Sequence, residues 1–149
     1  MVDMTKFNVG YTTGVFDLFH IGHLNILKNS KSICNELIVG VATDELAENL
    51  KGKKPFVPFD ERAEIVKNIK CVDRIVPQAI IDEVNDYYLY KFDVIIKGDD
   101  WKGTEKWNVL EKRLNAIGVK VVFFPYTKNI SSSKTREWLS SIESNSFQM

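Results

Sequence analysis

Strand-like apolar runs and helix-like segments alternate along the whole chain, and this alternation limits the possible folds more than any other feature. Strands are expected at Phe7–Tyr11 and within ELIVGVAT, DRIVPQ, DVIIKGDD and VKVVFFPY. Helices are expected at Gly22–Ile33, from an Asp60 N-cap through Ile69, at Ile81–Tyr90, at Thr104–Ile117 and in SSKTREWLS. The alternation predicts an α/β fold, a three-layer sandwich with a five-stranded parallel sheet and helices on both faces.

One segment does not follow the alternation. DELAENLKGKKPFVPFDER, residues 44–62, carries Gly52, Pro55 and Pro58, which are expected to interrupt any helix or strand. It also carries three clustered lysines. The segment is therefore predicted to be a flexible loop after the second strand.

The composition is that of one globular domain. With 149 residues and 44% hydrophobic content, the chain has enough apolar side chains for a single core over residues 1–149, and residues 143–149 are expected to fray. Twenty basic and twenty acidic side chains cancel. No overall field favours nucleic acid or an anionic membrane, so any phosphate site must be local.

The remaining bulk features indicate a cytoplasmic protein. Cys34 and Cys71 are flanked by apolar residues, which favours reduced thiols in the core over a disulfide. The first residues, MVDMTKFNV, lack the pattern of a secretory signal. No apolar run approaches the ~20 residues that cross a bilayer.

Four polar segments follow predicted strands: TTGVFDLFHIGH, DELAENLKGKK, GDDW and YTKNISSS. Parallel α/β sheets bind ligands beyond the carboxyl ends of their strands. These segments, distant in sequence, are therefore expected to meet at one edge of the sheet.

His20 and His23 are the two histidines of the chain, and they lie three residues apart around Gly22. On the first turn of a helix, this spacing puts both imidazoles on one face. The free N–H groups and positive dipole end of such a helix suit a phosphate, and imidazoles there can stabilise charge in a transition state. Three alternatives stay open: a zinc site lacking its further ligands, general-base chemistry, and two histidines that merely pack at a helix start.

The motif TTGVFDLFHIGH resembles the G-x-F-D-x-x-H-x-G-H motif of the nucleotidyltransferase superfamily. The segments VATDE, KGKKPFVPFDER, VDRIVP, GDDWKG and ISSSKTRE follow in the order found in cytidylyltransferases. The closest subgroup is the small, single-domain glycerol-3-phosphate cytidylyltransferases. The resemblance implies a Rossmann-like fold and covers nearly the whole chain.

The resemblance implies a reaction in which CTP and a small phosphorylated alcohol give a CDP-linked product and pyrophosphate. Attack on the α-phosphorus is direct, so no nucleophile–base pair is needed. Mg²⁺ would accompany CTP, and the products would serve capsule or cell-wall polysaccharide synthesis. Family members are commonly homodimers, so a homodimer is expected. An adenylyltransferase on the same fold and a non-catalytic nucleotide-binding regulator are the alternatives.

The resemblance also implies roles for individual residues. The catalytic group would be His20, His23 and Lys53. The nucleotide would contact Gly14, Val15, Phe16, His20, Gly22, His23, Lys53, Asp99, Ile130, Ser131, Ser132 and Ser133. The acceptor would contact Lys51, Asp17, Arg62, Trp101 and Asp82. Asp17 could instead orient the turn, and Arg62 would also brace the lysine segment. Trp101 could be a stacking platform or part of the core, and Asp99 or Asp100 could meet Mg²⁺.

The chain departs from the family pattern before the last helix. Relatives read R-T-x-G-I-S, whereas here Tyr126 replaces the arginine and Asn129 the glycine. Asn tolerates a positive φ, so the turn can survive. Lys128 or Lys134 could supply the lost positive charge, but a lysine cannot make the two parallel hydrogen bonds that an arginine makes to a phosphate.

A second departure concerns the acceptor. Glycerol-phosphate enzymes carry Trp and Lys just after the third strand, whereas this chain reads PQAIIDEVNDYY with Asp82, Glu83 and Asp86. Acidic groups suit an acceptor with an amine or amide N–H, such as a phosphorylated amino alcohol or a phosphoglutamine-type amide for capsule synthesis. The alternative is that they are exposed helix residues.

Overall fold

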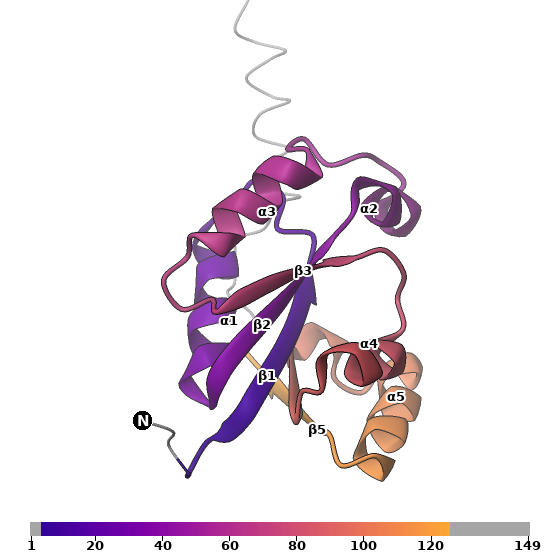
Figure 1. The fold of residues 1–149 in the computed structure, drawn as a ribbon. Helices are drawn as coiled ribbons and strands as arrows, with labels where there is room; N and C mark the ends of the chain where they lie inside the picture. The colour runs from indigo at the N-terminus through magenta and orange to yellow at the C-terminus, as the bar shows by residue number, and fades with distance from the viewer. Residues whose placement is uncertain (1–3, 126–149) are drawn as a thin grey trace, which may run out of the picture.

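A five-stranded parallel sheet lies at the centre of the structure (Figure 1). The computed structural model describes residues 4–125. The strands are β1 (Phe7–Gly14), β2 (Cys34–Ala42), β3 (Arg74–Gln78), β4 (Val94–Gly98) and β5 (Lys120–Phe124). The helices are α1 (Ile21–Ser32), α2 (Asp44–Lys51), α3 (Phe59–Lys67), α4 (Glu83–Tyr90) and α5 (Glu105–Ala116), with a 3₁₀ turn, η1 (Asp99–Trp101).

The strand order is β3-β2-β1-β4-β5, and every pairing is parallel. Tyr11 of β1 pairs with Ile38 on one side and with Ile95 on the other, so β1 is the central strand. The order reverses between β1 and β4, which is the point where open α/β sheets bind ligands. The predicted α/β, Rossmann-like architecture is confirmed.

Two hydrophobic cores lie on opposite faces of the sheet, with α1 and α3 on one face and α4 and α5 on the other (Figure 1). Leu27 of α1 and Val66 of α3 pack in one core, and Trp107 and Leu114 of α5 pack in the other. Both faces are thus covered, as the apolar strands predicted. Both cysteines are free, as expected, and no described helix combines the length and apolar character needed to cross a bilayer.

The prediction of a loop over the whole of residues 44–62 was wrong, because a helix, α2, forms directly after β2. Thr43 caps it by accepting a hydrogen bond from the Leu46 N–H at 3.2 Å, and Leu46 and Ala47 are buried. Gly52 ends it with a φ of 76°. The breakers therefore act after α2 and not within it.

The start of α3 and the end of β1 also differ from expectation. Asp60 lies inside the first turn of α3, whose N-cap is Pro58 and carries no side-chain cap. Pro58 fixes the extended backbone before the helix, and the Asp44 carboxylate accepts a hydrogen bond from the Phe59 N–H at 3.4 Å. The first strand continues through Gly14, three residues beyond Tyr11.

Candidate active site

The carboxyl ends of β1, β2 and β4 surround a hollow of about 320 Å³, a volume suited to a small ligand. The hollow brings together segments that the sequence predicted would meet. Its lining includes Gly14 at the end of β1, Val15 directly after it, Lys51 at the end of α2, and Trp101 in η1. Trp101 is 42% exposed, so it is not a core residue, and it is open to stacking.

The turn after β1 has an unusual backbone. Phe16 and Leu18 have φ values of 56° and 52°, which non-glycine residues rarely adopt. Phe16 is nonetheless buried, and a Cβ on Gly14 would lie 3.0 Å from its ring. Gly14 therefore makes room for Phe16, and the turn is held in a conformation of the kind found at functional sites.

His20 and His23 form a reciprocal cap at the start of α1. The Nδ1 atom of His20 accepts a hydrogen bond from the Gly22 N–H at 3.0 Å, and the Nδ1 atom of His23 accepts one from the His20 N–H at 3.1 Å. The rings stack with their centroids 3.9 Å apart. The predicted placement of both imidazoles together at a helix start is confirmed.

This geometry sets the protonation of both rings. An imidazole whose Nδ1 accepts a hydrogen bond carries its proton on Nε2 when neutral. Burial lowers the pKa of His20, and burial, the charge of His20 and the charge of Lys51 lower the pKa of His23 to about 4, against the opposing effect of Asp17. The Nε2 atom of His20 is buried without a partner in the described structure. Both rings are thus neutral with their protons on Nε2, and the Nε2 atom of His20 is enclosed in this structure. Neither histidine is among the residues that line the hollow.

Asp17 connects the turn after β1 to the loop between α2 and α3, residues 52–58, here called the lysine loop. Its carboxylate accepts hydrogen bonds from the N–H groups of Phe56 and Val57, both at 2.9 Å, and the side chain is 1% exposed. These bonds fix the backbone at Phe56 and Val57 relative to the turn, as an orienting role for Asp17 requires. The predicted contact of Asp17 with the acceptor stays a prediction.

Arg62 is a buried brace. Its guanidinium donates to the carbonyls of Val15, Ala42 and Val57 at 2.7–2.8 Å and forms an ion pair with Asp44 at 2.7 Å. The side chain is 0% exposed. The guanidinium joins the turn after β1 to β2, to α2 and to the loop before α3, as a bracing role requires. The predicted contact of Arg62 with the acceptor stays a prediction.

Lys51 and Lys53 lie in different elements, and only Lys51 differs from the predicted loop position. Lys51 is the last residue of α2 rather than part of a loop, and it lines the hollow. Its effect on the pKa of His23 puts the two side chains within electrostatic reach. Lys53 is exposed on the loop that follows. Its predicted phosphate contact stays a prediction.

Lys97, in β4, lines the same hollow and was missed from the sequence. Its Nζ donates to the Thr13 hydroxyl at 2.8 Å and lies 5.8 Å and 5.7 Å from the ring centroids of Trp101 and Trp107. Burial lowers the pKa of Lys97 to about 8. The available signal was a lone charge near the end of an otherwise apolar strand.

The three acidic residues near the start of α4 have different environments. Asp82 is exposed and caps α4 by accepting from the Asn85 N–H at 3.0 Å. Asp86 is buried and accepts from the Tyr11 hydroxyl at 2.9 Å, and burial raises its pKa to about 6 against the opposing effect of that bond. Glu83 is buried and lines the hollow. The interpretation as exposed helix residues is therefore wrong for Glu83 and Asp86.

Few side chains that could bind a metal ion lie close together in the described part of the chain. No three His, Cys, Asp or Glu side chains there come together as a metal site. The zinc alternative for His20 and His23 lacks further ligands among these residues. Asp99 and Asp100 are exposed after β4, where one or two carboxylates suit Mg²⁺ whose other ligands are phosphate oxygens.

Several predicted site residues lie outside the described residues. They are Ile130, Ser131, Ser132 and Ser133 of the expected phosphate cradle, and Tyr126, Lys128, Asn129 and Lys134 of the departing turn. Their roles stay predictions. Gly22 is described, and its N–H donates to Nδ1 of the N-cap residue His20, so this N–H is not directed to a nucleotide.

Comparison with known proteins agrees with the geometry. The family model described as cytidylyltransferase-like matches residues 11–138. The chain is 34% identical over 128 residues to a glycerol-3-phosphate cytidylyltransferase of Bacillus subtilis (strain 168), covering 85% of this chain and 92% of that protein. It is 37% identical over 129 residues to an FAD synthase of Pyrococcus abyssi (strain GE5 / Orsay), covering 82% and 83%.

A solved structure shows the same fold. The crystal structure of the lipopolysaccharide core biosynthesis protein from Thermoplasma volcanium GSS1 matches with a TM-score of 0.72 and 34% identity, covering 82% of this chain and 99% of that chain. The chain therefore belongs to the cytidylyltransferase-like family and is a nucleotidyltransferase.

Proposed function

We propose that the protein joins CTP to a small phosphorylated alcohol, glycerol 3-phosphate or a similar compound, to give a CDP-linked product and pyrophosphate. The family and the glycerol-3-phosphate cytidylyltransferase relative support this reaction class. So does the hollow, whose volume suits a small acceptor and whose lining includes Lys51 and Lys97 for anionic groups.

The observation that carries the proposal is the reciprocal cap of His20 and His23. Each Nδ1 is held by a backbone N–H, so each neutral ring keeps its proton on Nε2. Two such fixed donors suit phosphate oxygens at which negative charge grows during transfer. Donors held by the backbone need little reorganisation when the substrate reacts.

In the proposed step, an oxygen of the acceptor phosphate attacks the α-phosphorus of CTP in line. A new P–O bond forms, the bond from the α-phosphorus to the bridging oxygen of the β-phosphate breaks, and pyrophosphate leaves with that electron pair. His20 and His23 donate hydrogen bonds to α-phosphate oxygens. Lys51 and Lys53 offset the repulsion between the two polyanions.

The remaining parts of the proposal concern cofactor, cradle and assembly. Mg²⁺ bound with the triphosphate, held through Asp99 or Asp100, would neutralise phosphate charge. Ser131, Ser132 and Ser133 would bind the CTP phosphates, and the enzyme would work as a homodimer in the cytoplasm, supplying capsule or cell-wall synthesis.

Pyrophosphate release tests the proposal. The purified protein is incubated with Mg²⁺, each nucleoside triphosphate in turn, and a panel of phosphorylated alcohols, amino alcohols and amides. Turnover with CTP supports the proposal, whereas turnover with ATP alone indicates an adenylyltransferase, an alternative that the FAD synthase relatives keep open. Tight CTP binding without turnover of any acceptor indicates a regulator.

A further inference from the structure

Glu83 is a buried carboxylate that has no hydrogen-bond or ion-pair partner among residues 4–125. The side chain is 4% exposed, yet it makes no hydrogen bond or ion pair with any described residue, in contrast to Asp86 one turn later. Its carboxylate oxygens are not among the fully enclosed polar atoms without a partner, so they keep an opening to the hollow that Glu83 lines. A carboxylate this little exposed, with no partner among the described residues, is suited to bind a ligand. Nothing in the proposed transfer of the cytidylyl group uses Glu83.

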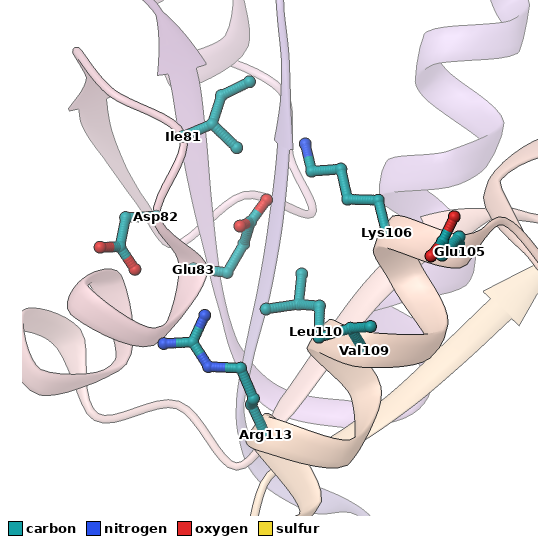
Figure 2. Close-up of a pocket in the computed structure, with 8 residues that line it drawn as sticks. All are labelled: Ile81, Asp82, Glu83, Glu105, Lys106, Val109, Leu110 and Arg113. Atoms are coloured by element: carbon teal, nitrogen blue, oxygen red, sulfur yellow. The ribbon is translucent and has the colours of Figure 1, made fainter.

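The position of Glu83 points to a ligand. Its side chain extends from the start of α4 into the space between α4 and α5, while Asp82 points away from α5 (Figure 2). A second hollow there, lined also by Arg113, shares Ile81, Glu83 and Lys106 with the active-site hollow. Glu83 therefore lies where the two hollows meet, within reach of a molecule bound beside Lys51.

Lys97, a half-buried cation that lines the hollow, does not pair with Glu83. Lys97 lies close enough for the Glu83 charge to act on it, but no ion pair within 4.0 Å forms between them. Instead the Lys97 Nζ donates to the carbonyl and hydroxyl oxygens of Thr13 at 3.3 Å and 2.8 Å. The hollow thus presents separate negative and positive groups, a surface complementary to a molecule carrying both charges.

We infer that Glu83 determines acceptor specificity by binding a cationic nitrogen of a phosphorylated acceptor. The inference rests on the proposed function and narrows its acceptor to a phosphorylated amine. The phosphate lies toward Lys51 and the α-phosphorus, and the ammonium donates to the Glu83 carboxylate. A charge-assisted hydrogen bond replaces the water that the carboxylate lost on burial.

The test compares two acceptors of one skeleton, glycerol 3-phosphate and its analogue with an ammonium in place of the C2 hydroxyl, 2-amino-3-hydroxypropyl phosphate. Calorimetry in the presence of a non-hydrolysable CTP analogue gives Kd, and pyrophosphate release gives kcat/KM. The wild type should bind the ammonium analogue about 10- to 100-fold more tightly, and Glu83→Gln should reduce this preference to less than about threefold.

Glu36→Gln is the matched control, because Glu36 is exposed near the start of β2, at the opposite end of the strand from the hollow. It should keep the wild-type preference. Glu83→Asp retains the charge and serves as a second variant should the glutamine variant misfold.

The outcomes separate the inference from the proposed function. A wild type that prefers glycerol 3-phosphate or binds neither acceptor, or a preference that survives Glu83→Gln, overturns the role of Glu83. If the binding preference depends on Glu83 but no pyrophosphate is released, the role of Glu83 is supported and the proposed reaction is ruled out. Turnover of both acceptors without discrimination keeps the reaction and overturns the inference.

Discussion

The backbone N–H of His20 donates to Nδ1 of His23, and the two imidazoles stack with centroids 3.9 Å apart. Two histidines thus act as the cap of α1 and, at the same time, direct both Nε2 atoms away from their own backbone. Helix capping and phosphate recognition are served by opposite nitrogens of the same rings. Protonation of either Nδ1 would break a cap.

The capping role predicts a pH dependence of stability. The pKa of His23 is about 4 in the folded state and 6.5 ordinarily, so between these values the unfolded chain binds the proton and the folded one does not. The stability due to His23 is therefore complete above about pH 6.5 and is lost as the pH falls toward 4. From pH 7 to pH 5 the loss should be about 2 kcal/mol.

Urea unfolding of the wild type and His23→Gln at the two pH values measures this loss. Gln does not titrate, so the variant should lack this part of the decline, and the stability gap between the two proteins should shrink at pH 5. Comparing the two proteins removes the contribution of Asp86, whose raised pKa acts in the opposite direction. An equal gap at both pH values would contradict the assigned protonation.

Asp17→Asn should loosen the lysine loop. The asparagine offers one acceptor and one N–H₂ group to the two N–H donors of Phe56 and Val57, so at least one bond is lost. We expect trypsin to cut after Lys51 and Lys53 several times faster, as followed by mass spectrometry. Asp60→Asn, an exposed change on α3, is the control. Unchanged cutting would mean that Asp17 does not hold the loop.

Arg62→Lys should destabilise the fold by about 3–5 kcal/mol, because an ammonium cannot replace the four contacts of the buried guanidinium and leaves carbonyls unsatisfied. Chemical denaturation measures the loss. Arg74→Lys, at an exposed position on β3, should change stability by less than about 1 kcal/mol. If Arg62→Lys lowers the stability as little as Arg74→Lys does, Arg62 does not brace the fold.

Lys97→Met should make the protein more stable at pH 7 and weaken its use of the acceptor. Between about pH 8 and 10.5 the unfolded chain holds the lysine proton that the folded state releases, so stability rises with pH there, and at pH 7 the folded protein carries a costly charge. Removing the charge should stabilise the protein at pH 7 by about 1–2 kcal/mol after the loss of the Thr13 bonds. The KM for the acceptor should rise, as initial rates can show. A less stable variant with an unchanged KM would contradict this account.

The sequence predicted the sheet because each strand is a compact apolar run and the polar segments follow the strands. It predicted the pairing of His20 and His23 because their spacing is local to one helical turn. It missed α2 because Pro55 and Pro58 dominate the composition of that segment, although Thr43 and Gly52 mark the helix that precedes them.

The parts that sequence reasoning missed depend on tertiary contacts. Glu83 and Asp86 read as surface residues, since nothing local shows that α4 turns them toward β1 and α5. The extent of the Arg62 contacts was not visible in the sequence, because Val15, Ala42 and Asp44 are distant from Arg62 along the chain. Lys97 is recognisable as a pocket residue only once β4 lies beside β1.

The rate of pyrophosphate release from CTP in the presence of the best phosphorylated acceptor tests the central claim most directly, with His20→Ala compared to the wild type. The account predicts that the variant folds, binds CTP within about tenfold of the wild type, and turns over 10²- to 10⁴-fold more slowly, as expected when a transition-state donor is lost. A folded His20→Ala that turns over within about threefold of the wild type would contradict the claim that the paired imidazoles stabilise the reacting phosphate.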